Sequence, residues 1–234
     1  MRRTDAETII LISAFTRITS GQGGSEQNFS LKRGDYSILC RMRIIAGTKR
    51  GMKLLSPKTQ DSRPITDRVK ESLFSVLYKY DLPNGKMVAD LFCGVGSLGL
   101  EALSRGAKFV TFVENDPKII AILKKNIEKA EFSGESKIIR TDAFEAGVPV
   151  SFDQQKHDLI FVDPPYSATR DAKEGSPLGR LLDILGRQLA AEGIVVVRAH
   201  KDTELLEQYS QLQTVERRQW GTMAVTILQK KTDE

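Results

Sequence analysis

The sequence predicts an α/β protein built on a doubly wound, mostly parallel sheet. From residue 86 onward, short apolar runs alternate with segments that have the periodicity of amphipathic helices. Two last apolar runs are separated only by a tight turn at Trp220-Gly221, which predicts an antiparallel hairpin at the sheet edge. We therefore expect seven strands, with helices between the parallel ones and a small β-hairpin and helix ahead of them.

The elements follow in order from these patterns. The expected strands are residues 87–92, 109–113, 137–140, 159–162, 194–199, 213–219 and 222–228. The expected helices are residues 97–104, about a dozen residues from Pro117, residues 178–189 and residues 203–209. Gly106 follows the first of these helices as a stop signal, and a proline at position 117 suits the first turn of the second.

Three regions are expected along the chain. Residues 1–41 contain a Gly/Ser-rich stretch and no core-forming pattern, so we expect a flexible extension, with Met42 as a second candidate start. Residues 42–83 hold a hairpin at 43–55 and a helix with apolar residues at helical spacing. Residues 84–234 form the sheet domain.

Composition excludes several classes of protein. No apolar run approaches the length of a membrane-spanning helix, and the longest run near the N-terminus is too short for a signal peptide. Two cysteines and two histidines are too few for a disulfide framework or a zinc site of usual spacing. We therefore expect a cytoplasmic protein without a metal. Neither histidine is placed in the site, and His157 is expected at the surface.

Positive charge is concentrated in one segment. The chain carries a net charge of +5, but residues 41–70 hold nine Lys or Arg against two acids, a balance of +7. The remaining chain therefore carries −2. A basic segment beside a near-neutral body is typical of a polyanion contact, with a solvated charged face as the alternative.

The tetrapeptide Asp163-Pro164-Pro165-Tyr166 directly follows the apolar run 159–162. Ligands of open α/β sheets bind at the carboxyl ends of the strands. Prolines are stiff and lack a backbone N–H, but their carbonyls still accept hydrogen bonds. The four residues suit a planar group with an amine, such as a nucleobase. The alternative is a strand that ends in a proline turn with a packed tyrosine.

A glycine-rich loop joins the strand at 87–92 to the helix at 97–104. Gly94, Gly96 and Gly99 match the spacing of a dinucleotide-binding loop, so a dehydrogenase has to be considered. Glycines allow a ligand to approach the backbone closely. Asp90 comes before the loop, and a carboxylate there suits a cationic ammonium group better than a pyrophosphate.

Acidic residues also end the next two strands. Glu114 stands where an acid commonly binds ribose hydroxyls, which both NAD and S-adenosylmethionine contain. Asp142 could accept from an adenine amine and Ala143 could supply an N–H, although a helix cap is an equally good explanation of Asp142. Together with Asp90 and Asp163, these acids predict one site along one edge of the sheet.

The order Asp90-x-Phe92-x-Gly94-x-Gly96, Glu114, Asp142 and Asp163-Pro164-Pro165-Tyr166 resembles a class I S-adenosylmethionine-dependent methyltransferase of the amino-methylating kind. With the segments 42–47, 63–71 and 90–107, the chain from Met42 on resembles the RsmD family, over roughly four-fifths of its length. Cys93 and Ile65 depart from the usual residues of that family. The fold implied is a Rossmann-like methyltransferase. The reaction implied is methylation of guanine N2 in 16S rRNA, at position 966 in conventional ribosomal numbering.

The resemblance also implies roles for individual residues. The implied catalytic residues are Asp163, Pro164, Pro165 and Tyr166. The implied contacts to S-adenosylmethionine are Asp90, Phe92, Gly94, Gly96, Glu114, Asn115, Asp142 and Ala143. The expected RNA contacts are Arg43, Lys49, Arg50, Lys53, Arg63, Thr66 and Arg68. The expected partner is 16S rRNA in the small ribosomal subunit or an assembly intermediate, bound by a monomer, with no membrane and no metal.

Three other functions remain open from the sequence. The protein could methylate an amine of DNA adenine, of cytosine N4 or of a protein glutamine, although glutamine enzymes typically have Asn at the position of Asp163. The glycine spacing leaves an NAD-dependent oxidoreductase, which protection from heat by NAD or by S-adenosylmethionine would distinguish. A non-catalytic RNA-binding protein would not need acids at four strand ends.

Overall fold

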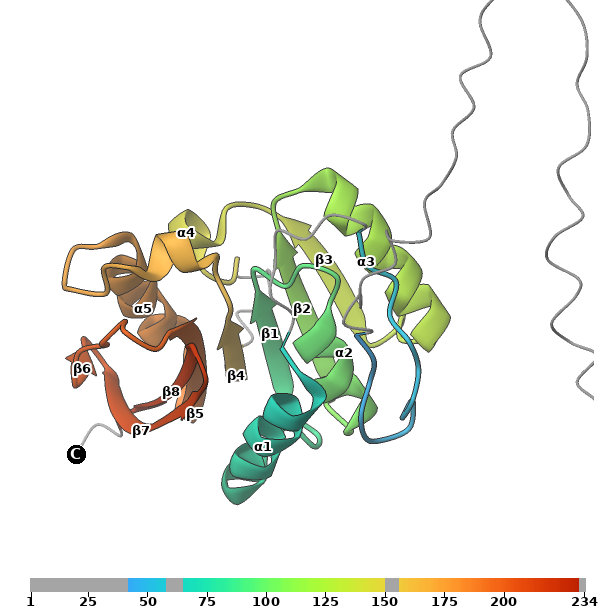
Figure 1. Cartoon of the computed structure of the whole chain (residues 1–234), viewed down its shortest axis with the longest axis horizontal. Helices are drawn as coiled ribbons and strands as arrows, with labels where there is room; N and C mark the ends of the chain where they lie inside the picture. Colours follow the sequence, from blue (N-terminus) through green and yellow to red (C-terminus); the bar gives the residue numbers. More distant parts are fainter. Residues whose placement is uncertain (1–41, 58–64, 150–155, 232–234) are drawn as a thin grey trace, which may run out of the picture. The chain divides into compact units, whose positions relative to one another are not determined.

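The computed structural model describes residues 42–57, 65–149 and 156–231. These residues form an eight-stranded sheet in the order β3-β2-β1-β4-β5-β8-β7-β6 (Figure 1). The strands are β1 (Met87–Leu91), β2 (Phe109–Glu114), β3 (Ser136–Arg140), β4 (His157–Val162), β5 (Leu189–His200), β6 (Gln208–Tyr209), β7 (Leu212–Trp220) and β8 (Met223–Lys230). Neighbouring strands from β3 to β5 pair in parallel, and β8, β7 and β6 continue the sheet antiparallel.

Helices cover both faces of this sheet (Figure 1). The helical segments are α1 (Asp67–Leu77), η1 (Tyr78–Tyr80), α2 (Ser97–Ser104), α3 (Pro117–Ala130), α4 (Ala143–Ala146), η2 (Tyr166–Thr169) and α5 (Pro177–Gln188). Apolar side chains of α1, α2 and α3 share one buried cluster with the sheet, and those of α5 share the other. This arrangement confirms the doubly wound α/β fold predicted from the sequence.

The apolar runs form central strands because both of their faces are covered. Along β4, Leu159 and Phe161 point into the cluster with α1 and α2, whereas Ile160 and Val162 point into the cluster with α5. The strand order reverses between β1 and β4. The carboxyl ends of these two strands therefore flank the point where open α/β sheets bind ligands.

Two predictions about elements have to be corrected. The sheet has eight described strands rather than the seven predicted, because Gln208 and Tyr209 add the short β6 to its edge. The helix predicted at 203–209 is wrong. Instead, the hydroxyl of the buried Tyr209 accepts from Leu206 N at 2.9 Å, and Thr214 N donates to Glu207 O at 2.9 Å. These contacts hold the segment as a turn that leads into β6.

The segment 42–57 turns back on itself, as a hairpin does, but only Arg43 and Lys53 form an antiparallel bridge. Ile44 N donates to Met52 O at 2.9 Å, and Leu54 N donates to Met42 O at 2.8 Å. The turn lies directly on α2, because a Cβ at Gly47 would meet the carbonyl oxygen of Ser104 at 1.7 Å. This segment therefore packs against the sheet domain. The extension 1–41 lies outside the described residues.

Within the described ranges, the structure has no helix that is both long and apolar enough to cross a membrane.

Candidate active site

A cavity of about 710 Å³ opens at the carboxyl ends of β1, β2 and β4. Its walls come from the segment 42–57, the chain leading into α1, the glycine loop, the start of α3, the tetrapeptide and β5. The lining residues are Met42, Pro57, Ile65, Asp90, Phe92, Cys93, Gly94, Val95, Ser97, Leu98, Glu114, Ile119, Asp163, Pro164, Pro165, Tyr166, Ser167 and Arg198. The tetrapeptide and the glycine loop, which are 70 residues apart in the sequence, thus face one cavity.

The tetrapeptide continues β4 and then turns into η2. Asp163 N donates to Leu91 O of β1 at 3.3 Å, so the segment is still tied to the sheet at its first residue. Pro164 is buried, and Pro165 is exposed. The Tyr166 ring is half-buried and meets the His200 ring edge-on, with 5.8 Å between ring centroids. All four predicted catalytic residues therefore line the cavity.

Asp163 forms an ion pair with Arg198 of β5, whose Nε donates to the Asp163 Oδ1 atom. Burial raises the pKa of the Asp163 carboxyl group, and the Arg198 guanidinium opposes that shift. Arg198 was not among the residues predicted for the site. The sequence does carry a signal for it, because Arg198 is a single charged residue in the apolar run 194–199, which is unusual for a buried strand.

Asp90 is almost fully buried beneath the glycine loop. Its Oδ2 atom accepts a hydrogen bond from Gly99 N at 2.8 Å, so the carboxylate ties β1 to the first turn of α2. Burial raises the pKa of Asp90 to about 8, and the nearby carboxylates of Asp163 and Glu114 add to the shift, whereas the Gly99 N–H opposes it. A cationic ligand group beside Asp90 would favour its carboxylate form and would lower this pKa.

The loop after Asp90 has the backbone conformation that close ligand approach requires. Phe92 has a φ of 57°, which is unusual for a residue with a side chain, and Gly94 and Gly96 have φ values of 54° and 89°. The Phe92 ring packs against Phe144 with 4.7 Å between centroids. Gly94 lines the cavity, whereas Gly96 is buried behind it.

Glu114 holds this loop from the end of β2. One carboxylate oxygen accepts from Gly94 N at 3.0 Å, and the other accepts from Asn115 N at 2.8 Å and from Asp116 N at 3.0 Å. Glu114 lines the cavity, but Asn115 does not. The same carboxylate that faces the cavity therefore also fixes the position of the glycine loop.

Asp142 and Ala143 are not among the lining residues of the cavity. Asp142 is exposed, and its side chain accepts from Phe144 N at 2.9 Å as the N-cap of α4. The helix-cap alternative raised for Asp142 is therefore confirmed, and Ala143 is buried in the first turn of the same helix. Contacts from these two residues to a cofactor stay a prediction.

The predicted RNA-binding residues that the structure describes are not among the lining residues of the cavity. Arg43 forms an ion pair with Asp67 at 2.7 Å. Lys49 forms an ion pair with Glu131, the residue that follows α3. The exposed members of the described set are Arg43, Arg50, Lys53, Thr66 and Arg68, and Lys49 is half-buried. Thr66 caps α1 by accepting from Val69 N at 3.4 Å, and Arg63 lies outside the described residues. Their contacts to RNA stay a prediction.

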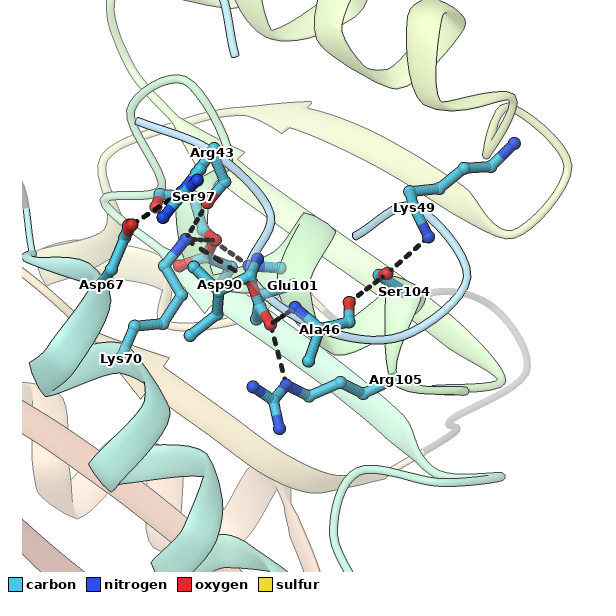
Figure 2. A network of polar contacts seen from close by, with 12 residues as sticks. Arg43, Ala46, Lys49, Asp67, Lys70, Asp90, Ser97, Glu101, Ser104 and Arg105 are labelled. Atoms are coloured by element: carbon cyan, nitrogen blue, oxygen red, sulfur yellow. Dashed lines mark hydrogen bonds and ion pairs between the residues drawn. The ribbon is translucent and has the colours of Figure 1, made fainter. Parts of the chain in front are cut away.

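A buried network fixes the basic segment to the sheet domain (Figure 2). The carboxylate of Glu101 in α2 accepts from Ile45 N at 2.8 Å and from Ala46 N at 3.1 Å, and it also accepts from Arg105 Nε at 2.8 Å. Lys70 of α1 points into the same network, 3.5 Å from Glu101, and burial lowers its pKa despite that partner. The chain around Met42, which lines the cavity, is thereby held in place.

Comparisons with known proteins agree with this geometry. Residues 42–229 match the family described as Conserved hypothetical protein 95. The chain is 33% identical over 192 residues to the candidate rRNA methyltransferase YlbH of Bacillus subtilis, which covers 81% of this chain and 100% of YlbH. It is 41% identical over 125 residues to the ribosomal RNA small subunit methyltransferase D of Haemophilus influenzae, which covers 53% of this chain and 64% of that protein.

Solved structures show the same fold. The candidate methyltransferase yhhF of Escherichia coli superimposes with a TM-score of 0.68 at 29% identity, covering 82% of this chain and 99% of that chain. The family match spans all the residues that line the cavity, and YlbH is matched over its full length. The chain therefore belongs to the Conserved hypothetical protein 95 family, which is the RsmD family of rRNA methyltransferases.

Proposed function

We propose that this protein transfers a methyl group from S-adenosylmethionine to the exocyclic N2 of a guanine in the 16S rRNA of the small ribosomal subunit. Family membership and the name of the Haemophilus influenzae relative support the substrate class. The structural observation behind the proposal is that Asp163 to Tyr166 and the acid-flanked glycine loop line one cavity. Position 966 is the nucleotide that the family resemblance suggests. For a ribosomal substrate we expect the reaction to take place in the cytoplasm.

The residues at the glycine-loop side fit S-adenosylmethionine. The Oγ atom of Ser97, at the start of α2, is buried without a hydrogen-bond partner among the described residues, and Ser97 lines the cavity. Such an unsatisfied polar atom suits a polar ligand group. Asp90 would hold the ammonium group and Glu114 would accept from the ribose hydroxyls, with Gly94 and Phe92 against the nucleoside. The cofactor supplies an electrophilic methyl group on a sulfonium sulfur.

At the opposite wall, Asp163 and Pro164 would receive the substrate amine. The lone pair of guanine N2 is delocalised into the ring, which makes the nitrogen a poor nucleophile. Hydrogen bonds from its N–H groups to the Asp163 carboxylate and the Pro164 carbonyl would favour a tetrahedral, more nucleophilic nitrogen. Tyr166 would stack on the base and hold it in line with the methyl group. The amine loses one proton on methylation, to Asp163 or to water.

RNA would reach this cavity across the basic segment. Arg43, Arg50, Lys53 and Arg68 are exposed, and the half-buried Lys49 directly precedes Arg50. Such contacts bind phosphates and give affinity without identifying the base. Residues 42–83 would then act as the RNA-binding region and residues 84–234 as the methyltransferase domain, with Arg63 and Thr66 near the entrance.

A transfer assay tests the substrate class. The protein is incubated with methyl-labelled S-adenosylmethionine and, in separate reactions, small-subunit particles or 16S rRNA from a strain that lacks the enzyme, DNA, and total protein. We expect label in the rRNA alone. Label confined to DNA or protein would favour one of the other amino-methyltransferases, and no label with any substrate would contradict the proposal.

A further inference from the structure

Arg198 stands beside Asp163 because of the register between two parallel strands. Leu159 pairs with Ile194, and Val162 pairs with Val197. One residue further along, the same register brings Asp163 next to Arg198, with both side chains on the face that α1 and α2 cover. Their ion pair is therefore built into the sheet and does not depend on a flexible loop.

Both members of the pair are largely withdrawn from solvent. Only 14% of the Arg198 side chain and 19% of the Asp163 side chain are exposed. Arg198 Nη1 also lies 3.9 Å from the sulfur of Met223 on β8, which fixes the guanidinium from its other side. A planar guanidinium held at two points constrains the orientation of a carboxylate more strongly than a single flexible ammonium would.

The other groups near Asp163 are acids or neutral side chains. The charged and titratable side chains that line the cavity are Asp90 on β1, Cys93 in the glycine loop, Glu114 on β2, Tyr166 in η2 and Arg198 on β5. His200 of β5 lies behind them, against the Tyr166 ring. Burial in the cavity wall disfavours the carboxylate form of Asp163. Within this set, Arg198 is the cation that contacts Asp163 and offsets that cost.

We propose that Arg198 is a positioning residue for methyl transfer, which binds Oδ1 of Asp163 and so presents Oδ2, in its ionised form, to the substrate amine. The inference rests on the proposed function, because it assigns Asp163 as the acceptor for that amine. Arg198 acts through Asp163 and does not itself receive the methyl group or the proton.

The pH dependence of the reaction gives a readout that a purely structural role would not change. Burial raises the pKa of Asp163 and Arg198 lowers it. Amine binding requires the carboxylate, so activity is present above the pKa of Asp163 and is lost as the pH falls through it. Removing the guanidinium should therefore move the acid limb of the pH–rate profile upward, by about 1–3 pH units for a charge in contact.

The test compares Arg198→Met with Arg218→Met under single-turnover conditions at saturating S-adenosylmethionine. Arg218 is a matched control, because Arg198 and Arg218 both pair with Val225 of β8 and so lie on one face of the sheet. Arg218 is paired with Glu216 and does not line the cavity. Both variants lose one guanidinium and gain the same side chain.

We expect the acid limb of Arg198→Met to shift upward by at least one pH unit, with the affinity for S-adenosylmethionine within about threefold of wild type. Arg218→Met should keep the wild-type limb. In Arg198→Lys the acid limb should return most of the way to its wild-type pH, because the positive charge is restored. The maximal rate should stay below that of wild type, because the planar contact is lost. If Arg198→Met does not fold, Arg198→Gln provides the same neutral substitution.

The positioning role would be overturned if the acid limb of the pH–rate profile stayed at its wild-type position in Arg198→Met or Arg198→Gln. It would also be overturned if the limb of Arg218→Met shifted by the same amount. This result differs from a failure of the proposed function. In that case the wild-type protein itself would not methylate the rRNA, and no pH–rate profile could be measured.

Discussion

The buried carboxylate of Asp90 accepts a hydrogen bond from the backbone N–H of Gly99 at 2.8 Å, across the glycine loop. Both residues were singled out from the sequence as parts of a ligand-binding loop. The structure adds a direct hydrogen bond between them, so Asp90 helps to fix the conformation of the loop. The stability of the loop and the charge of Asp90 are therefore linked.

The first prediction concerns Asp90→Asn and pH. The pKa of Asp90 is raised from 3.8 to about 8 in the folded protein. Between these values the folded state keeps a proton that the unfolded chain releases. The stability that Asp90 contributes is therefore full below about pH 4 and is lost as the pH rises through 8. The free energy of unfolding of Asp90→Asn should therefore rise relative to that of wild type by on the order of 1 kcal/mol for each pH unit of increase across this range.

Urea unfolding of the unliganded protein at several pH values measures this difference. A difference between Asp90→Asn and wild type that stays constant from pH 5 to 8 would show that Asp90 is ionised throughout. The account of a protonated acid beneath the loop would then be wrong.

The sequence predicted most of the fold because the pattern of the central strands is simple. The helix 97–104 was placed at its exact bounds, since Gly96 and Gly106 both have positive φ values that end regular structure. The strands β1, β2 and β4 were found from apolar runs that both layers of helices bury. The cavity was predicted for the same reason, because acids that end parallel strands meet at one edge.

Other features depend on contacts that sequence periodicity does not contain. The helical pattern at 203–209 is overridden by the burial of Tyr209, whose hydroxyl accepts from Leu206 N and donates to the distant Ala172 O. His157, expected at the surface, is buried beside Thr111. Arg198 and the pair of Lys70 and Glu101 were missed, because a charged residue in an apolar run reveals its partner only when the strands and helices are assembled.

The second prediction concerns the proposed acceptor for the amine. Asp163→Ala should reduce the single-turnover rate of methyl transfer at least about a hundredfold, since preorganised acceptors at a reacting group are commonly worth that much. The affinity for S-adenosylmethionine, measured by calorimetry, should change little. Asp171→Ala serves as a control, because Asp171 is an exposed acid outside the cavity. Full activity of Asp163→Ala would remove Asp163 from the mechanism.

The third prediction concerns the basic segment. Lys49 is already paired with Glu131, so the exposed Arg50 and Lys53 are the better probes of phosphate contact. The double variant Arg50→Ala/Lys53→Ala should bind rRNA more weakly and reduce the slope of log affinity against log salt by about 1.4, at roughly 0.7 per charge. Filter binding at several salt concentrations measures both quantities.

A matched control removes two lysines at the amino ends of central strands, away from the cavity. Lys86 and Lys108 come directly before β1 and β2, at the ends of the strands away from the cavity. The variant Lys86→Ala/Lys108→Ala has the same change in net charge, and it should keep the wild-type salt slope. Equal slopes for the two double variants would argue against a specific role of the basic segment.

The fourth prediction concerns the buried network in Figure 2. Glu101→Ala would leave the N–H groups of Ile45 and Ala46 unsatisfied and would remove the carboxylate beside Lys70 and Arg105. Breaking a buried ionic network from one side should lower the free energy of unfolding by about 3–5 kcal/mol.

Lys70→Met should cost less, because Glu101 keeps Arg105 and both backbone donors as partners. Chemical denaturation followed by circular dichroism compares the two variants. A larger loss for Lys70→Met than for Glu101→Ala would contradict the role of Glu101 as the centre of the network.

The central claim is that the cavity methylates guanine N2 in small-subunit rRNA. The most direct measurement labels rRNA from a strain lacking the enzyme. Mass spectrometry of one portion, digested to nucleosides, identifies the modified nucleoside, and primer extension on intact rRNA locates it. We predict one labelled product, N2-methylguanosine, at a single guanine of 16S rRNA, and none with Asp163→Ala. Label on an adenine, on a cytosine or on guanine at a position other than N2 would contradict the account.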